Sequence, residues 1–120
     1  MKSVLIVDDA VFMRAALKNL LSDSGFNVVG EASDGQEAIN KYKDLRPDIV
    51  TMDITMKGMD GIDGLKGILD IDSKAKVVMI SALGQETYVK KAMISGAKTF
   101  IIKPYKNEHV IKTLNKVLEL

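Results

Sequence analysis

The chain has 120 residues, 47% of them hydrophobic and 28% charged, with a formal net charge of +1 at pH 7. This length suits one domain with one sizeable core. The lack of cysteine excludes disulfides and thiolate metal sites, and the single histidine, His109, nearly excludes zinc chemistry. No apolar run is long enough to span a membrane and the start lacks a signal-peptide profile, so we expect a cytoplasmic protein without membrane contacts.

The small net charge conceals an asymmetry. Residues 1–60 carry seven Lys/Arg and ten Asp/Glu, a net charge of −3, whereas residues 61–120 carry ten and six, a net charge of +4. This difference is typical either of chance variation among short surface helices or of a partner-binding face that favours acidic peptides. Scattered lysines and few aromatic residues do not predict a nucleic-acid interface.

The first half of the chain reads as two strand–helix units. Strand Ser3–Val7 precedes a helix whose apolar face is formed by Met13, Ala16, Leu17, Leu20 and Leu21. Gly25 suits the position just after that helix. Strand Asn27–Gly30 leads to Asp34-Gly35-Gln36-Glu37, which resembles a capping box at the start of the second helix. Arg46-Pro47 ends this helix, because the residue before a proline disfavours the α region.

The same alternation continues to the end of the chain. Three more strands are predicted, at Ile49–Met52, Lys76–Ile80 and Thr99–Ile102. The third helix, from about Ile62 to Asp70, contains Gly64 and Gly67, each of which costs roughly 1 kcal/mol relative to alanine in a helix interior. The fourth helix is marked by Val89, Ala92 and Met93 and ends at Gly96. The fifth helix is marked by Val110, Leu114, Val117 and Leu118, with Asn107 as its expected N-cap.

These elements predict an α/β fold. The strands are almost uninterrupted hydrophobic runs, which is typical of a parallel sheet covered by helices on both faces. A doubly wound (βα)5 arrangement uses residues 1–120 as one domain and leaves none for an output domain.

Polar side chains follow the predicted strands where ligands bind to open α/β sheets. Asp8 and Asp9 follow the first strand, Asp53 the third, and Ser81 and Lys103 the fourth and fifth. Three carboxylates at one edge repel each other unless a cation lies between them. Oxygen ligands without cysteine or histidine favour Mg²⁺ over zinc or copper.

Each of these residues also has a structural interpretation. Asp9 could cap the first helix with Asp8 as a solvated neighbour, Ser81 could cap a helix or a turn, and Lys103 could be a surface charge. Beside three carboxylates, however, Lys103 can hold the oxygens of a phosphoryl group as a point charge, and Ser81 can hydrogen-bond the same group.

Several segments together resemble the receiver domain of two-component response regulators, and among them the stand-alone chemotaxis regulators. The resemblance covers nearly the whole chain, in the family's order and spacing. It is carried by Val4-Leu5-Ile6-Val7-Asp8-Asp9, Pro47-Asp48-Ile49-Val50-Thr51-Met52-Asp53, Met59-Asp60-Gly61, Ser81-Ala82 and Ile101-Ile102-Lys103-Pro104.

This resemblance implies a flavodoxin-like strand order of 2-1-3-4-5 and a phosphoryl-accepting site. Asp53 would take a phosphoryl group from a sensor histidine kinase (CheA-like) or from a small phosphodonor. Asp8, Asp9, Asp53 and the backbone carbonyl of Thr55 would hold Mg²⁺. The protein would catalyse its own phosphorylation and dephosphorylation without being a conventional enzyme.

The resemblance also implies a switch. Lys103 would pair with the phosphoryl oxygens, Ser81 would move inward to bond one of them, and Phe100 would turn inward with it. The face built by the fourth helix, fifth strand and fifth helix would then meet a flagellar or other motility switch protein or an adaptor. A phosphatase is a further expected partner, and the protein is expected to be a monomer.

Three positions depart from the family pattern. Lys57 stands where many receivers have proline, so the loop after Asp53 loses a fixed φ. Phe100 lacks the hydroxyl that a tyrosine would offer a partner. The resemblance places Thr55 and Leu83 at the two positions that flank the family's route for hydrolytic water. Leu83 is apolar and cannot orient that water, so we expect a geometry unfavourable to autodephosphorylation.

Three alternatives to a motility switch share parts of the same site. A single-domain phosphorelay intermediate differs only in its partner, and a pseudo-receiver would bind without accepting phosphate. A Mg²⁺-dependent phosphohydrolase with an aspartate nucleophile usually carries a second acid two residues later, where this chain has Thr55.

Overall fold

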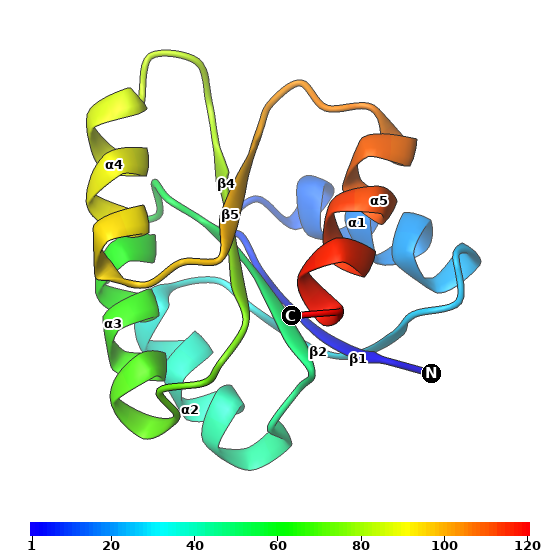
Figure 1. Cartoon of the computed structure of the whole chain (residues 1–120), viewed down its shortest axis with the longest axis horizontal. Coiled ribbons are helices and arrows are strands. Elements are labelled where there is room, and N and C mark those ends of the chain that lie inside the picture. Colours follow the sequence, from blue (N-terminus) through cyan, green and yellow to red (C-terminus); the bar gives the residue numbers. More distant parts are fainter.

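Five parallel strands form the middle layer of the computed structural model, which describes residues 1–120 (Figure 1). The strand order is β2-β1-β3-β4-β5, which confirms the predicted doubly wound sheet. Every neighbouring pair is parallel, as expected for strands that are each joined to the next through a helix. The strands are β1 (Ser3–Val7), β2 (Asn27–Ala32), β3 (Ile49–Asp53), β4 (Val77–Ser81) and β5 (Thr99–Ile102).

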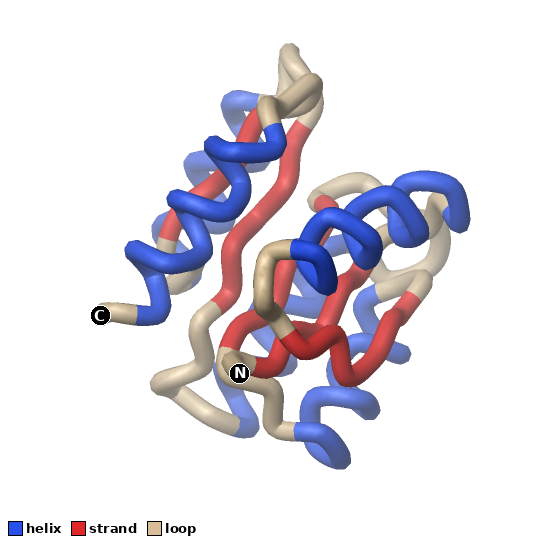
Figure 2. The backbone as a smooth tube through the Cα atoms, turned by 90° about the vertical axis from the view of Figure 1, so that its right-hand side faces the viewer, coloured by secondary structure: helices blue, strands red, loops and turns tan.

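Helices cover both faces of this sheet (Figures 1 and 2). In Figure 1, α2, α3 and α4 lie to the left of the strands, and α1 and α5 lie to the right. None of the helices is both long and apolar enough to cross a membrane. The helices are α1 (Val11–Asp23), α2 (Gly35–Leu45), α3 (Gly61–Ile71), α4 (Glu86–Ser95) and α5 (Asn107–Leu118).

The alternation of side chains along each strand divides the hydrophobic core into two clusters. In β1, Leu5 and Val7 belong to the cluster beneath α2, α3 and α4, whereas Val4 and Ile6 belong to the cluster beneath α1 and α5. All four side chains are buried. Burial on both faces explains why the strands read as continuous hydrophobic runs.

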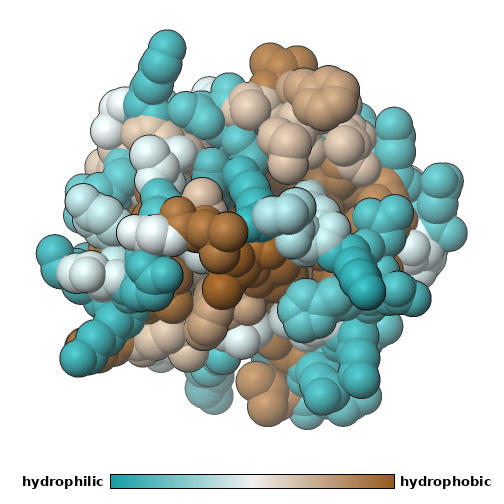
Figure 3. Space-filling view, turned by 90° about the horizontal axis from the view of Figure 1, so that it is seen from above, coloured by the Kyte–Doolittle hydropathy of each residue, from teal (hydrophilic) through white to brown (hydrophobic).

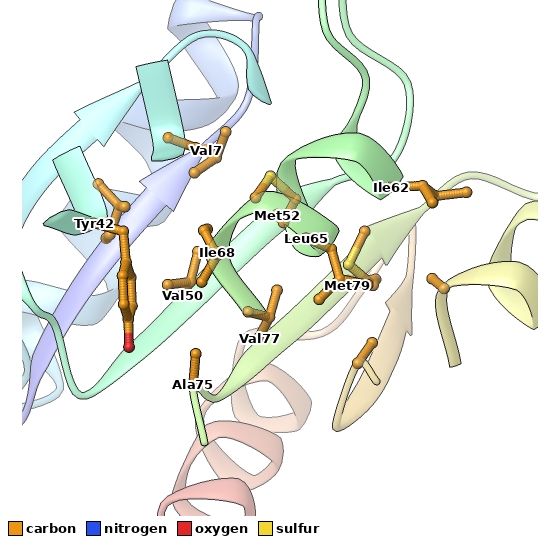
Figure 4. Packing of buried hydrophobic residues seen from close by; sticks show 14 of the residues in the cluster. Val7, Tyr42, Val50, Met52, Ile62, Leu65, Ile68, Ala75, Val77 and Met79 are labelled. Carbon is orange, nitrogen blue, oxygen red and sulfur yellow. The ribbon is translucent and has the colours of Figure 1, made fainter. Parts of the chain in front are cut away.

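Close packing explains the two glycines inside α3. A Cβ atom on Gly67 would lie 2.2 Å from Cδ1 of Ile39 in α2, and one on Gly64 would lie 3.0 Å from the Cα of Gly35. The glycines therefore lower helix propensity but allow α2 and α3 to approach each other. Figure 4 shows the apolar face of α3, with Leu65 and Ile68, against the side chains of β3 and β4.

Most predicted element ends are confirmed to within two residues, and one detail is wrong. The N-cap of α5 is Lys106, with no side-chain cap, and Asn107 is already the first helical residue. Arg46 ends α2 as predicted, and it does so in a left-handed conformation with φ of 44°. Asp34 caps α2 through a bond from the N–H of Glu37, and the Glu37 carboxylate accepts from the N–H of Ser33, which completes the predicted capping box.

One buried hydroxyl in the core has no hydrogen-bond partner. Thr51 lies in the middle of β3 with no solvent exposure, and its Oγ1 atom is unpaired. Its register neighbours on either side are Ile6 of β1 and Val78 of β4, both in the cluster beneath α1 and α5. A polar atom in these surroundings opposes folding.

Replacing this hydroxyl with a methyl group should stabilise the fold. We expect Thr51→Val to raise the free energy of unfolding by about 1 kcal/mol, because it removes an unsatisfied buried polar group at nearly constant shape. Urea unfolding followed by circular dichroism measures this change. Val78→Thr, the reverse exchange on the neighbouring strand, is the matched control and should lower stability. Equal or lower stability of Thr51→Val would show that the hydroxyl has a partner in solution.

Candidate functional site

Three carboxylates meet at the carboxyl edge of the sheet. Asp53 is the last residue of β3, and Asp8 and Asp9 directly follow β1, the strand beside it. One oxygen from each carboxylate lies within 4.8 Å of the other two. The chain thus brings together the three acids that the sequence analysis singled out.

Asp8 is held from several directions. Its Oδ1 accepts a hydrogen bond of 2.9 Å from the N–H of Ala10, and its main-chain carbonyl accepts one of 2.6 Å from Nη1 of Arg14. The Nε atom of Arg14 in turn lies 3.3 Å from Oε1 of Glu31 on β2. Asp8 is buried, and its Oδ2 atom points toward the lysine at the same edge.

Asp9 is exposed and does not cap the first helix. The N-cap of α1 is Ala10, which makes no side-chain cap, so the structural interpretation of Asp9 is wrong. Instead, Oδ2 of Asp9 accepts a hydrogen bond of 3.2 Å from the backbone N–H of Lys57 in the loop after β3. Proline has no N–H, so a proline at this position could not make this bond. The departure at Lys57 therefore links Asp9 to the loop.

Lys103 supplies the positive charge at this site. Its Nζ atom lies 3.5 Å from Oδ2 of Asp8 and 3.6 Å from Oδ1 of Asp53. Its side chain is only 25% exposed, so solvent screens these pairs less than it would on an open surface. The N–H of Lys103 also donates a 2.7 Å bond to the carbonyl of Ser81, which holds the end of β5 against β4.

Burial and the neighbouring like charges raise the pKa of Asp53, so its carboxyl group ionises at a higher pH than an exposed aspartate does. Burial raises the pKa of Asp53, Lys103 lowers it, and the neighbouring carboxylates of Asp8 and Asp9 raise it, which together give a pKa of about 6. The balance shows that one lysine does not fully offset burial and two nearby acids. A further cation between the carboxylates would stabilise the ionised form.

Ser81 carries a second buried hydroxyl without a partner. It is the last residue of β4, is 1% exposed, and its Oγ atom makes no hydrogen bond. Asp53 and Ile80 are paired in register, so Ser81 comes one residue beyond the partner of Asp53. The N-cap of α4 is Gln85, so the interpretation of Ser81 as a helix cap is wrong.

The loop between β3 and α3 returns closely over the end of β3. The N–H of Gly61 donates a 2.9 Å bond to the carbonyl of Ile54, and a Cβ atom on Gly61 would lie 2.0 Å from the carbonyl oxygen of Asp53. Only glycine permits this approach. Thr55, in the same loop, is exposed, and its hydroxyl accepts a hydrogen bond from the side-chain amide of Gln85.

Phe100, the expected switch residue, lies at the margin of the core rather than inside it. It is 38% exposed and lines an apolar cavity of about 400 Å³ between α4 and the end of β5. Ser81, Leu83, Met93 and Ile102 also line this cavity. Figure 3, which views the molecule from above, shows brown hydrophobic residues exposed among teal hydrophilic ones on this side of the molecule.

Three residues near the site were not singled out from the sequence. Arg14 lies on α1, six residues after Asp8, and its positive charge close to the acidic pair could have indicated a role in holding the first loop. Gln85 and Tyr105 carried no such signal. Burial raises the pKa of the half-buried Tyr105, while Lys103 lowers it and Asp8 raises it.

A doubly wound parallel sheet with a carboxylate cluster, a lysine and a free hydroxyl at its carboxyl edge defines a class of α/β protein that binds ligands at that edge. The family model of the response regulator receiver domain matches residues 4–115. The chain therefore belongs to the response regulator receiver family.

Curated relatives of similar length support this assignment. The chain is 54% identical to the chemotaxis protein CheY of Thermotoga maritima over 116 residues, which cover 97% of each protein. It is 51% identical to the chemotaxis protein CheY of Bacillus subtilis over 115 residues, which cover 96% of each protein.

Solved structures show the same fold. A chain of the crystal structure of the CheX-CheY-BeF3-Mg+2 complex from Borrelia burgdorferi is 48% identical, with a TM-score of 0.91. This match covers 97% of the present chain and 88% of that chain. The response regulator domain of Thermotoga maritima CheB is 33% identical, with a TM-score of 0.92, and the match covers 100% of the present chain and 98% of that chain.

The raised pKa of Asp53 predicts a pH-dependent stability. Its ordinary value is 3.8 and its folded value is about 6, so the folded state holds a proton that the unfolded state has lost between these values. The free energy of unfolding should therefore fall as pH rises through this window, by on the order of 3 kcal/mol relative to Asp53→Asn.

Urea unfolding in EDTA, between about pH 4 and pH 7, measures this effect as the difference between wild type and Asp53→Asn. Asp70→Asn, at an exposed carboxylate on α3, is the control and should follow the wild type. A pH-independent difference between wild type and Asp53→Asn would contradict the raised pKa.

Proposed function

We propose that this protein is a CheY-like signalling switch that accepts a phosphoryl group on Asp53. The observation that carries this proposal is the convergence of Asp8, Asp9, Asp53 and Lys103 beside the unpartnered hydroxyl of Ser81. A carboxylate nucleophile, a positive point charge and a free hydrogen-bond donor at one edge are the groups that phosphoryl transfer requires.

The donor set fits Mg²⁺. Asp8, Asp9 and Asp53 offer oxygen ligands within 4.8 Å of one another, and no cysteine or histidine competes for a softer metal. These carboxylates and the backbone carbonyl of Thr55 would hold the ion. When bound, Mg²⁺ would neutralise charge on the transferring phosphoryl group and on the carboxylates. The Mg²⁺ in the complex of the Borrelia relative supports this proposal.

The protein's own residues would then carry the transfer. An oxygen of the Asp53 carboxylate attacks phosphorus, a new O–P bond forms, and the P–N bond of a phosphohistidine on a sensor kinase breaks. Lys103, whose Nζ already lies 3.6 Å from Oδ1 of Asp53, would pair with the phosphoryl oxygens as charge shifts onto them. Asp53 is ionised, and hence nucleophilic, above its pKa of about 6.

The signal would pass from Ser81 to the outer face of α4 and β5. The Ser81 hydroxyl is free to bond a phosphoryl oxygen, and Phe100 lines a cavity beside it that could accept a turned ring. The chemotaxis relatives support a motility switch protein or an adaptor as target, a CheA-like kinase as donor, and a role in controlling motility. The CheX complex of the Borrelia relative supports a phosphatase as a further partner.

Phosphorylation should depend on both Asp53 and Mg²⁺. We expect intact-mass spectrometry after incubation with acetyl phosphate and Mg²⁺ to show one phosphoryl adduct on the wild type. The adduct should be absent from Asp53→Asn and from a sample in EDTA, because one lacks the nucleophile and the other the cation. Asp70→Asn controls for loss of a surface acid. No adduct on a folded wild type would favour the pseudo-receiver alternative.

The backbone N–H of Lys57 should strengthen Mg²⁺ binding, because it holds the otherwise exposed Asp9 carboxylate beside Asp53. We expect Lys57→Pro to weaken Mg²⁺ affinity by about threefold to tenfold, since it removes a hydrogen bond to a charged group. Mg²⁺ titrations followed by NMR shifts of the backbone amides measure the affinity.

Lys57→Ala is the matched control, because it removes the side chain but keeps the N–H. This variant should bind Mg²⁺ at least as tightly as the wild type. Equal Mg²⁺ affinities of Lys57→Pro and Lys57→Ala would show that the backbone N–H of residue 57 does not contribute to Mg²⁺ binding.

A further inference from the structure

The side chain of Gln85 spans two loops at the site. Its Oε1 atom accepts a hydrogen bond of 2.6 Å from the backbone N–H of Ala82, and its Nε2 atom donates to Oγ1 of Thr55. Ala82 directly follows β4, and Thr55 lies two residues after Asp53. One carboxamide therefore joins the β4–α4 loop to the β3–α3 loop. We refer to this pair of hydrogen bonds as the Gln85 bridge.

The local backbone is shaped for this bridge. Gly84, just before Gln85, has a φ of 88°, a conformation that side-chain-bearing residues rarely adopt. This left-handed turn directs the chain back, so that Gln85, the N-cap residue of α4, reaches the amide three residues before it. Gln85 makes no cap bond within its own helix. Its polar atoms are instead used between the loops.

The bridge sits beside the one free hydroxyl of the site. Ser81 immediately precedes Ala82, is buried, and has no hydrogen-bond partner, whereas the Ala82 N–H is fully used by Gln85. Rotation of the Ser81 side chain alone leaves the Ala82 amide in place. A movement of the Ser81 backbone toward Asp53, however, carries the attached Ala82 amide with it and strains or breaks the bond to Gln85.

We propose that Gln85 is a positioning residue that holds the β4–α4 loop in its resting place and must release the Ala82 N–H when a phosphoryl group occupies Asp53. Release leaves a backbone donor next to Ser81 free to face the incoming anion. The bridge therefore opposes phosphorylation, and its loss favours it. This inference rests on the proposed function of Asp53. Two measurements therefore test it: one reports on the Gln85 bridge alone, and the other on phosphorylation of Asp53.

The first measurement concerns the bridge alone, in protein without metal or phosphodonor. Amide hydrogen exchange by NMR should show faster exchange of the Ala82 N–H in Gln85→Ala than in the wild type. Thr55→Val removes only the distant anchor of the bridge and should also speed exchange at Ala82, by a smaller factor. If the exchange rate of the Ala82 N–H is unchanged in both variants, Gln85 does not hold this N–H, and the proposal is overturned.

The second measurement concerns phosphorylation. With acetyl phosphate and Mg²⁺, Gln85→Ala should form the Asp53 adduct about threefold to tenfold faster than the wild type, as expected for the loss of one or two opposing hydrogen bonds. The double variant Gln85→Ala/Thr55→Val should accelerate adduct formation by less than the product of the two single accelerations, because both changes break the same bridge.

A matched glutamine provides the control. Gln36 is exposed on α2, and its amide donates only to Asn40 one turn further along the same helix. Gln36→Ala should leave both the Ala82 exchange and the adduct rate unchanged. A merely structural role of Gln85 would lower the unfolding temperature without raising the adduct rate, and that result would overturn the proposal.

The two measurements also distinguish a failure of the Gln85 inference from a failure of the proposed function. An adduct that forms equally fast on wild type and Gln85→Ala overturns this inference and leaves the proposed function intact. No adduct on the wild type overturns the proposed function and the coupling together, while the exchange data still report whether Gln85 links the two loops.

Discussion

The structure depends on one electrostatic constraint, the gathering at one edge of the sheet of three carboxylates, two of which pair with a single lysine. Parallel strands make this arrangement unavoidable, because β1 and β3 are neighbours and both end at that edge. Burial raises the pKa of Asp53, the carboxylates of Asp8 and Asp9 add to this rise, and Lys103 only partly offsets it, so the pKa reaches about 6. The excess negative charge of the ionised carboxylates therefore favours binding of a cation, and the surrounding fold keeps these carboxylates close together.

Hydrogen bonds from the surrounding loops restrain the same edge. Arg14 holds the carbonyl of Asp8, the Lys57 N–H holds Asp9, and Gln85 joins the two loops on either side of Ser81. All of these contacts except the one between Gln85 and Thr55 have a backbone atom on one side, so the side-chain types in the sequence do not reveal them. Two buried hydroxyls remain unpaired, but only that of Ser81 lies at the strand end beside the acids. The hydroxyl of Thr51 lies within the core, where it has no ligand to meet.

Much of the fold and the membership of the site could be predicted, and the errors share a cause. Strand and helix positions follow from hydrophobic periodicity, and the site residues follow from polar groups after each strand. The capping roles of Asp9, Ser81 and Asn107 were wrong or unsupported, because a cap depends on backbone direction at the helix start. The exposure of Phe100 also depends on the tertiary structure, because β5 is an edge strand whose outer face is only partly covered.

The sequence by itself determined the α/β alternation, the parallel sheet and the residue types at its carboxyl edge, since local hydrophobic pattern and strand order along the chain suffice for these. Only the tertiary structure decided which groups are in contact: that Lys103 lies between Asp8 and Asp53, that the Lys57 N–H reaches Asp9, and that Gln85 spans to Thr55. These pairs are 30 or more residues apart along the chain, as in the Gln85–Thr55 bond. Their distances depend on how the loops pack over the strand ends, which no local pattern in the sequence encodes.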